Sequence, residues 1–201
     1  MTVTRRSSRT ILQACLFVLL SVSVFGNSAF AQWTLDNEAS TLSFITVKAE
    51  HVAEVHTFDM LSGTVSASGQ VQVSIELASV NTLIPIRNER MQAMLFETGM
   101  FPRAEITANV DAASLSSLAS GEVARQSVEF NLSLHGASKS YTAELLIIGL
   151  ENGVQVSTTK PIIVTAGDHN LITGVEALRE VAGLPSISQA VPVSFTLAFT
   201  H

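Results

Sequence analysis

Hydrophobic and polar residues alternate along several stretches of the chain, the pattern of strands with one buried face. In the clearest stretch, residues 71–77, Val, Ile and Leu alternate with Gln, Ser and Glu. Residues 128–134 and 191–199 repeat this pattern. Weaker alternation covers residues 41–48, 55–67, 104–110, 140–149 and 153–165. The pattern predicts an all-β fold of eight strands, arranged as an antiparallel barrel or sandwich, with a tight hairpin at Asn152-Gly153.

Two short segments follow a helical period instead. Residues 174–183 place Val175, Leu178, Val181 and Ala182 on one side of a helix that ends at Gly183, before a proline. This helix should cover an apolar surface. Residues 87–97 carry Met91, Met94 and Leu95 at helical spacing, together with several charges, and predict a helical crossover or lid between two strands.

The N-terminal residues 1–31 have the order of a secretory signal peptide. Three arginines precede the apolar run 14–20, and Ala29-Phe30-Ala31 provides a small-residue cleavage site. The apolar run is shorter than the about 20 residues needed to cross a bilayer. We therefore predict cleavage after Ala31, general secretion, and a mature domain of residues 32–201 with no integral membrane segment.

Cleavage changes the composition in two ways. The mature chain has eight basic and seventeen acidic residues, a formal net charge of −9, which argues against a nucleic-acid partner. It also loses Cys15, the one cysteine, so neither a disulfide nor a thiolate site is available. The remaining 170 residues are enough for one domain with a sizeable core.

The mature chain resembles the YceI-like family of periplasmic, polyisoprenoid-binding proteins in four segments that occur in order. The segments are Trp33-Thr34-Leu35-Asp36 with Ser40-Thr41-Leu42-Ser43-Phe44, then Phe58 to Gly63, then Arg87-Asn88-Glu89-Arg90-Met91 with Leu95-Phe96-Glu97 and Phe101-Pro102, and finally His135-Gly136-Ala137-Ser138-Lys139. The third segment is similar to the family's Arg-Asp-x-His-Leu, Phe-Phe-Asp and Tyr-Pro signature, with Asn88, Arg90, Glu97 and Phe101 at four of its usual Asp, His, Asp and Tyr positions. The resemblance implies a lipocalin-like barrel of eight antiparallel strands. Its interior would hold the chain of an amphiphilic isoprenoid, either a polyprenyl phosphate or a ubiquinone-type quinone.

Under this resemblance the inward apolar residues become candidates for lipid contact. The candidates are Leu42, Phe44, Phe58, Val73, Ile75, Leu77, Met91, Met94, Phe96, Ile106, Phe130, Leu132, Phe195 and Leu197. Ordinary core packing explains the same stripe equally well, because an eight-stranded barrel is either filled by its own side chains or holds one small ligand.

The charged, Met-rich segment has two interpretations. Adaptable methionines could form one wall of a lipid channel, with Arg87 and Arg90 meeting the head group at its mouth. Alternatively, the segment plugs one end of the barrel and its arginines are solvated or paired to Glu89 and Glu97. The sequence leaves both open.

No catalytic or cofactor-binding motif is recognisable in the sequence. His51, Glu54 and His56 are the one close cluster of histidine and carboxylate, but their spacing suits a polar loop better than a metal site. His135 and Lys139 flank a predicted turn. We therefore expect a protein that is not an enzyme, has no metal or cofactor, and binds, transports or stores an isoprenoid lipid in the periplasm.

Two other functions remain open at this stage. An eight-stranded outer-membrane barrel would show the same periodicity with its apolar stripes facing lipid, although one Trp and one Tyr are few for the aromatic girdles of such barrels. An enzyme that uses the barrel pocket is the third class. The oligomeric state, a homodimer included, is also left open.

Overall fold

The computed structural model describes residues 1–2 and 31–201, without the side chains of residues 31 and 32. Residues 3–30, most of the predicted signal peptide of residues 1–31, thus lie outside the described residues, and its cleavage before Gln32 stays a prediction. No helix in the described part of the chain is long and apolar enough to cross a membrane.

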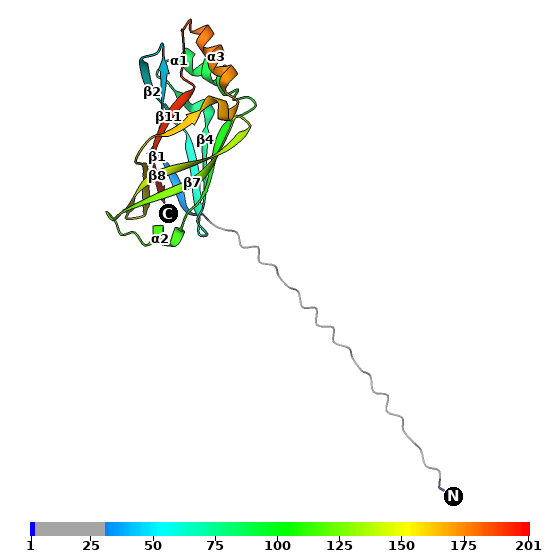
Figure 1. Ribbon diagram of the computed structural model, residues 1–201. Coiled ribbons are helices and arrows are strands. Elements are labelled where there is room, and N and C mark those ends of the chain that lie inside the picture. Colours follow the sequence, from blue (N-terminus) through cyan, green and yellow to red (C-terminus); the bar gives the residue numbers. More distant parts are fainter. Residues whose placement is uncertain (3–30) are drawn as a thin grey trace.

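Eight strands close into an antiparallel barrel, because the last strand of the chain pairs with the first (Figure 1). In ring order they are β1 (Ala31–Lys48), β3 (Leu61–Ser66), β4 (Gln70–Glu76), β6 (Arg103–Asn109), β7 (Val123–Leu134), β8 (Ala137–Leu150), β9 (Gly153–Thr158) and β11 (Ala190–Thr200). The predicted eight-stranded barrel is confirmed.

Three further strands lengthen the sheet at one end of the ring. β2 (Val52–Phe58) pairs with the C-terminal half of β1, β5 (Val80–Asn81) pairs with β2, and β10 (Ile162–Thr165) pairs with the N-terminal half of β11. The predictions of single strands over 55–67 and 153–165 are therefore wrong. Each range holds two strands, because the chain changes its pairing partner in the middle of the range.

Helices occupy both ends of the barrel. α1 (Pro85–Arg90) continues into the π-helical turn η2 (Met91–Leu95), and it lies with α3 (Ile172–Val181) at the end drawn uppermost in Figure 1. The two predicted helical segments are confirmed. α2 (Ala112–Ser116), at the opposite end, was not predicted. Two 3-10 turns, η1 (Leu77–Ser79) and η3 (Ala166–His169), complete the fold.

The alternation of the strands places apolar side chains inside the barrel. Val73, Ile75, Phe130 and Leu132 are buried, whereas Glu129 and Asn131 between them are exposed. The stripes thus face inward, in contrast to the membrane-barrel alternative, in which they would face outward.

The β8–β9 hairpin brings the chain close to β11. Leu150 pairs with Gly153, as the Asn-Gly pair predicted. Gly153 has φ +154°, and a Cβ at this position would lie 1.9 Å from the Phe199 carbonyl oxygen. Only glycine permits this approach of the two strands.

Candidate functional site

A cavity of about 350 Å³ occupies the half of the barrel that carries α1 and α3. Its wall is almost entirely apolar and comes from β1, β2, β4, β6, β7, β10 and β11, with both helices across its outer end. Ile84, Ile86 and Val181 line it and are themselves exposed, so the cavity reaches the surface between α1 and α3. Its volume lies within the range of small-molecule sites.

Most of the predicted lipid-contact residues surround this cavity. They are Leu42, Phe44, Phe58, Ile75, Leu77, Met91, Phe96, Ile106, Phe130, Leu132 and Phe195. Val73 and Leu197 line a second, smaller cavity deeper in the barrel. Met94 lines neither, and instead its backbone carbonyl packs against α3, where a Cβ at Gly174 would lie 2.7 Å from the Met94 oxygen.

The apolar face of α3 closes the cavity from the outside. Val175, Leu178, Val181 and Ala182, the residues whose spacing predicted the helix, all line the cavity. The helix ends at Val181; Gly183, just beyond it, has φ +63°, and the Leu184 N–H donates to the Arg179 carbonyl oxygen at 3.0 Å. The expectation that this helix covers an apolar surface is confirmed.

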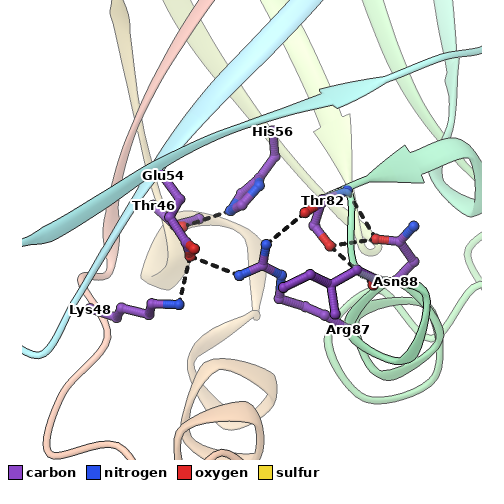
Figure 2. Close-up of polar contacts among 8 residues, drawn as sticks. Thr46, Lys48, Glu54, His56, Thr82, Arg87 and Asn88 are labelled. Carbon is purple, nitrogen blue, oxygen red and sulfur yellow. Dashed lines mark hydrogen bonds and ion pairs between the residues drawn. The ribbon is translucent and has the colours of Figure 1, made fainter.

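Polar side chains gather at this outer end of the cavity (Figure 2). The Glu54 carboxylate lies 2.7 Å from both the Lys48 ammonium and the Arg87 guanidinium. Arg87 also donates to the Thr82 carbonyl oxygen at 2.7 Å, and Thr82 donates from its backbone and hydroxyl to the Asn88 side chain. The ion pairs therefore tie α1 to β2 beside the mouth.

The charges of this cluster are set by its contacts. The hydrogen bond from Lys48, with the charge of Arg87, holds the pKa of Glu54 below its ordinary value although partial burial opposes the shift. Burial lowers the pKa of His56, and the positive charge of Arg87 lowers it further. His56 is 3% exposed, and its Nε2 lies 2.9 Å from the Thr46 hydroxyl. Its Nδ1 has no hydrogen-bond partner among the described residues.

The two predicted head-group arginines both line the cavity, but their surroundings differ. Arg87 pairs with Glu54, whereas the plug interpretation expected a pairing with Glu89 or Glu97. The buried Nε of Arg87 has no hydrogen-bond partner in the described chain. Glu97 instead lies 2.8 Å from His135. Arg90 has no ion pair or side-chain hydrogen bond within residues 33–201. Arg90 is thus available to an incoming group.

Sequence reasoning missed Thr46, Lys48, Glu54 and His56 as parts of this site. The period of two could have found them. On β1, Thr46 and Lys48 continue the inward positions of Leu42 and Phe44. On β2, Glu54 and His56 share the face of Phe58. The spacing between His51 and Glu54 obscured this, because His51 lies outside the strand and is exposed.

The remaining polar clusters belong to the fold. His135 and Gly136 have φ +49° and +74° in the β7–β8 turn, as expected for turn residues. Lys139 pairs with Asp168 outside the cavity. No group of three His, Cys, Asp or Glu side chains that could hold a metal occurs among the described residues.

The fold and the cavity define a class of protein. An eight-stranded antiparallel barrel with an apolar interior, opening at one end beside helices, has the architecture of a lipocalin-like binding barrel. The chain belongs to the YceI-like family: the model of the YceI-like domain matches residues 33–199.

Solved structures agree with this assignment. A polyisoprenoid binding domain from Saccharophagus degradans, implicated in plant cell wall breakdown, is 40% identical with a TM-score of 0.83, over 85% of this chain and 98% of that one. BcnA of Burkholderia cenocepacia is 17% identical with a TM-score of 0.63, over 82% and 98% of the two chains. The Campylobacter jejuni YCEI protein is 16% identical with a TM-score of 0.53, over 73% and 84%. The search of curated proteins found no match.

Proposed function

We propose that this protein binds an isoprenoid lipid, with the chain in the apolar cavity and the head at the polar cluster. The observation that carries the proposal is the distribution of polarity in the cavity. Its wall is almost entirely apolar, and the charged groups Lys48, Glu54, Arg87 and Arg90 stand at its outer end. An amphiphile has the same division. The polyisoprenoid binding domain that is 40% identical to this chain supports an isoprenoid over other lipids.

The energetics favour binding of a long apolar chain. Burial of each methylene stabilises the bound state by about 0.8 kcal/mol. The partly exposed side chains of Phe58, Ile106, Val193 and Phe195 in the wall are not fully covered by the protein itself. A lipid tail would cover these side chains, so that both the ligand and the wall would bury apolar surface that is otherwise exposed to water.

The proposed role is binding, transport or storage in the periplasm, without catalysis. The predicted signal peptide and the family support this location. The titratable residues that line the cavity (Lys48, Glu54, His56, Arg87 and Arg90) all belong to the polar cluster, and the rest of the wall consists mainly of apolar side chains that can enclose a tail.

Organic extraction of the purified mature protein, with native mass spectrometry before and after, tests the proposal. We expect a mass excess that disappears on extraction and an extract that contains an isoprenoid. Ala104→Phe provides the matched variant, because Ala104 lines the cavity and a phenyl ring there would fill it. It should fold, as judged by circular dichroism, and lose the lipid. An extract with no isoprenoid would contradict the proposal.

The head group is either phosphorylated or a quinone, and Arg90 distinguishes the two. A phosphate would accept charge-assisted hydrogen bonds from its guanidinium, each contributing about 1.5–3 kcal/mol, whereas a quinone ring carries no charge. We propose the phosphorylated head, because Arg90 lines the mouth without a partner in the described chain. Arg90→Gln should then lower lipid retention about tenfold or more.

Arg125→Gln is the control for this experiment, since it removes the same charge from an exposed position on β7 outside the cavity. Equal retention of a phosphorylated lipid by the wild type and Arg90→Gln would contradict head-group recognition. A quinone that Arg90→Gln retains fully would make the arginine a solvated part of the lid.

A further inference from the structure

The barrel interior contains two cavities, one above the other. The smaller cavity, of about 100 Å³, lies toward the α2 end and is lined by residues of β3, β4, β6, β7, β8, β9 and β11. Gln126 is the one polar residue in its wall. A cavity of this character stays dry and is suited only to apolar atoms.

Three residues line both cavities and form the layer between them: Ile106, Phe130 and Phe195. Along each strand the neighbouring inward residues fall on one side or the other. On β11, Val193 lines only the large cavity and Leu197 only the small one. Because β6 lies directly opposite β11 in the ring of eight, Ile106 and Phe195 line the layer from opposite walls.

The members of this layer differ in how firmly they are held. The Phe130 ring stacks on Tyr141 with centroids 5.8 Å apart, and the Tyr141 hydroxyl lies 2.9 Å from Nε2 of His169, which is completely buried. Phe130 is therefore fixed by a chain of contacts through Tyr141 to His169. Ile106 and Phe195 are only partly covered.

We propose that the layer of Ile106, Phe130 and Phe195 sets the length of lipid tail that the protein accepts. This inference rests on the proposed function. A tail that enters from the α1 and α3 end fills the large cavity and stops at the layer. The space beyond it would take roughly three more groups of the size of a water molecule, at about 30 Å³ each. Removing one ring of the layer should join the two cavities and admit a tail longer by about this amount.

Phe195→Ala and Phe199→Ala form a matched pair for the test. Both remove a phenyl ring from β11, but Phe195 belongs to the layer whereas Phe199 lines only the small cavity behind it. Binding is measured by native mass spectrometry for two series of increasing length, straight-chain primary alcohols and prenyl alcohols from geraniol upward. Circular dichroism checks folding, and Ile106→Ala serves as a smaller change of the same layer if Phe195→Ala does not fold.

We expect the wild type and Phe199→Ala to share one length limit in each series. Phe195→Ala should bind the first member beyond that limit at least tenfold more tightly than the wild type does. Equal limits for all three proteins, or an equal extension in both variants, would overturn the inference. Binding of straight-chain alcohols with rejection of all prenyl alcohols would contradict the proposed isoprenoid function while still testing the layer. Rejection of both series by the wild type would overturn both.

Discussion

Leu83 combines two unfavourable features in one residue. Its φ of +61° is in the left-handed region, and its side chain is 87% exposed. The surrounding hydrogen bonds impose this conformation: buried Thr82 is held by Asn88, and the Leu83 N–H donates to the Asn81 side chain at 3.0 Å. The loop geometry is thus fixed by its polar neighbours, and Leu83 contributes no packing in return.

Leu83→Asn should stabilise the protein. A non-glycine residue in the left-handed region costs about 1–2 kcal/mol, and asparagine tolerates it better than leucine. We expect the free energy of unfolding in urea to rise by roughly 0.5–1 kcal/mol. Met60→Asn, at another exposed apolar position without a positive φ, is the control. If both variants shift stability equally, backbone strain is not the cause.

At the scale of elements, the sequence predicted those strands whose pattern is uninterrupted and whose partners do not change. β4 and β7 are of this kind. The break between β2 and β3 at Asp59 was missed because apolar residues occur on both sides of it, although the buried positions change from even numbers in β2 (His56) to odd numbers in β3 (Leu61, Val65). α2 escaped detection since its five residues contain a single large apolar side chain, Leu115, which is too little for a helical period.

The candidate site was predictable only in its apolar part. Alternating Leu, Phe and Val residues stand out in a sequence, and most of those singled out line the cavity. Lys48 and Glu54 occupy equally inward positions, but polar residues at inward positions look like the end of a strand. The pairing of Glu54 with Arg87 depends on the contact between β2 and α1, which joins positions 33 residues apart and leaves no local signal.

Glu54→Gln should loosen this contact between β2 and α1. It leaves Lys48 and Arg87 without their shared carboxylate, and the Arg87 side chain is 24% exposed. We expect a loss of about 1–2 kcal/mol in the free energy of unfolding, measured in urea. The control is Glu76→Gln, whose partner Arg103 is 61% exposed and whose loss should cost less than about 1 kcal/mol. Equal losses in the two variants would contradict a special role for Glu54.

At the scale of the molecule, two long strands divide the barrel into a narrow and a wide half. β1 pairs with β3 near its start and with β2 near its end, and β11 likewise pairs with β10 and then β9. The added strands widen the sheet where α1 and α3 lie, and the large cavity is in that half. The other half keeps the plain ring, and the small cavity lies there. The added strands thus make the room for a ligand.

The same wide half contains two buried histidines that should make the protein sensitive to acid. Burial lowers the pKa of His56, which faces Glu54, Arg87 and Lys48, and of His169, near Asp168 and Lys139, from the ordinary 6.5. Below this value the unfolded chain takes up protons that the folded protein does not. The stabilising contribution is therefore complete above about pH 6.5 and is lost as the pH falls toward the folded pKa.

We expect the free energy of unfolding to fall between about pH 6.5 and 5 by up to about 1.4 kcal/mol per pH unit for each histidine. Glu54 does not contribute to this change, because the stabilisation that accompanies its lowered pKa is lost only as the pH falls below the ordinary value of 4.5. His56→Gln should reduce the slope by about half, since its amide can still meet the Thr46 hydroxyl while nothing titrates there. His51→Gln, at an exposed position, is the control. Urea titrations at several pH values provide the measurement. An unfolding free energy that stays constant over this range, or falls as steeply in His56→Gln as in the wild type, would mean that burial of His56 does not couple protonation to folding.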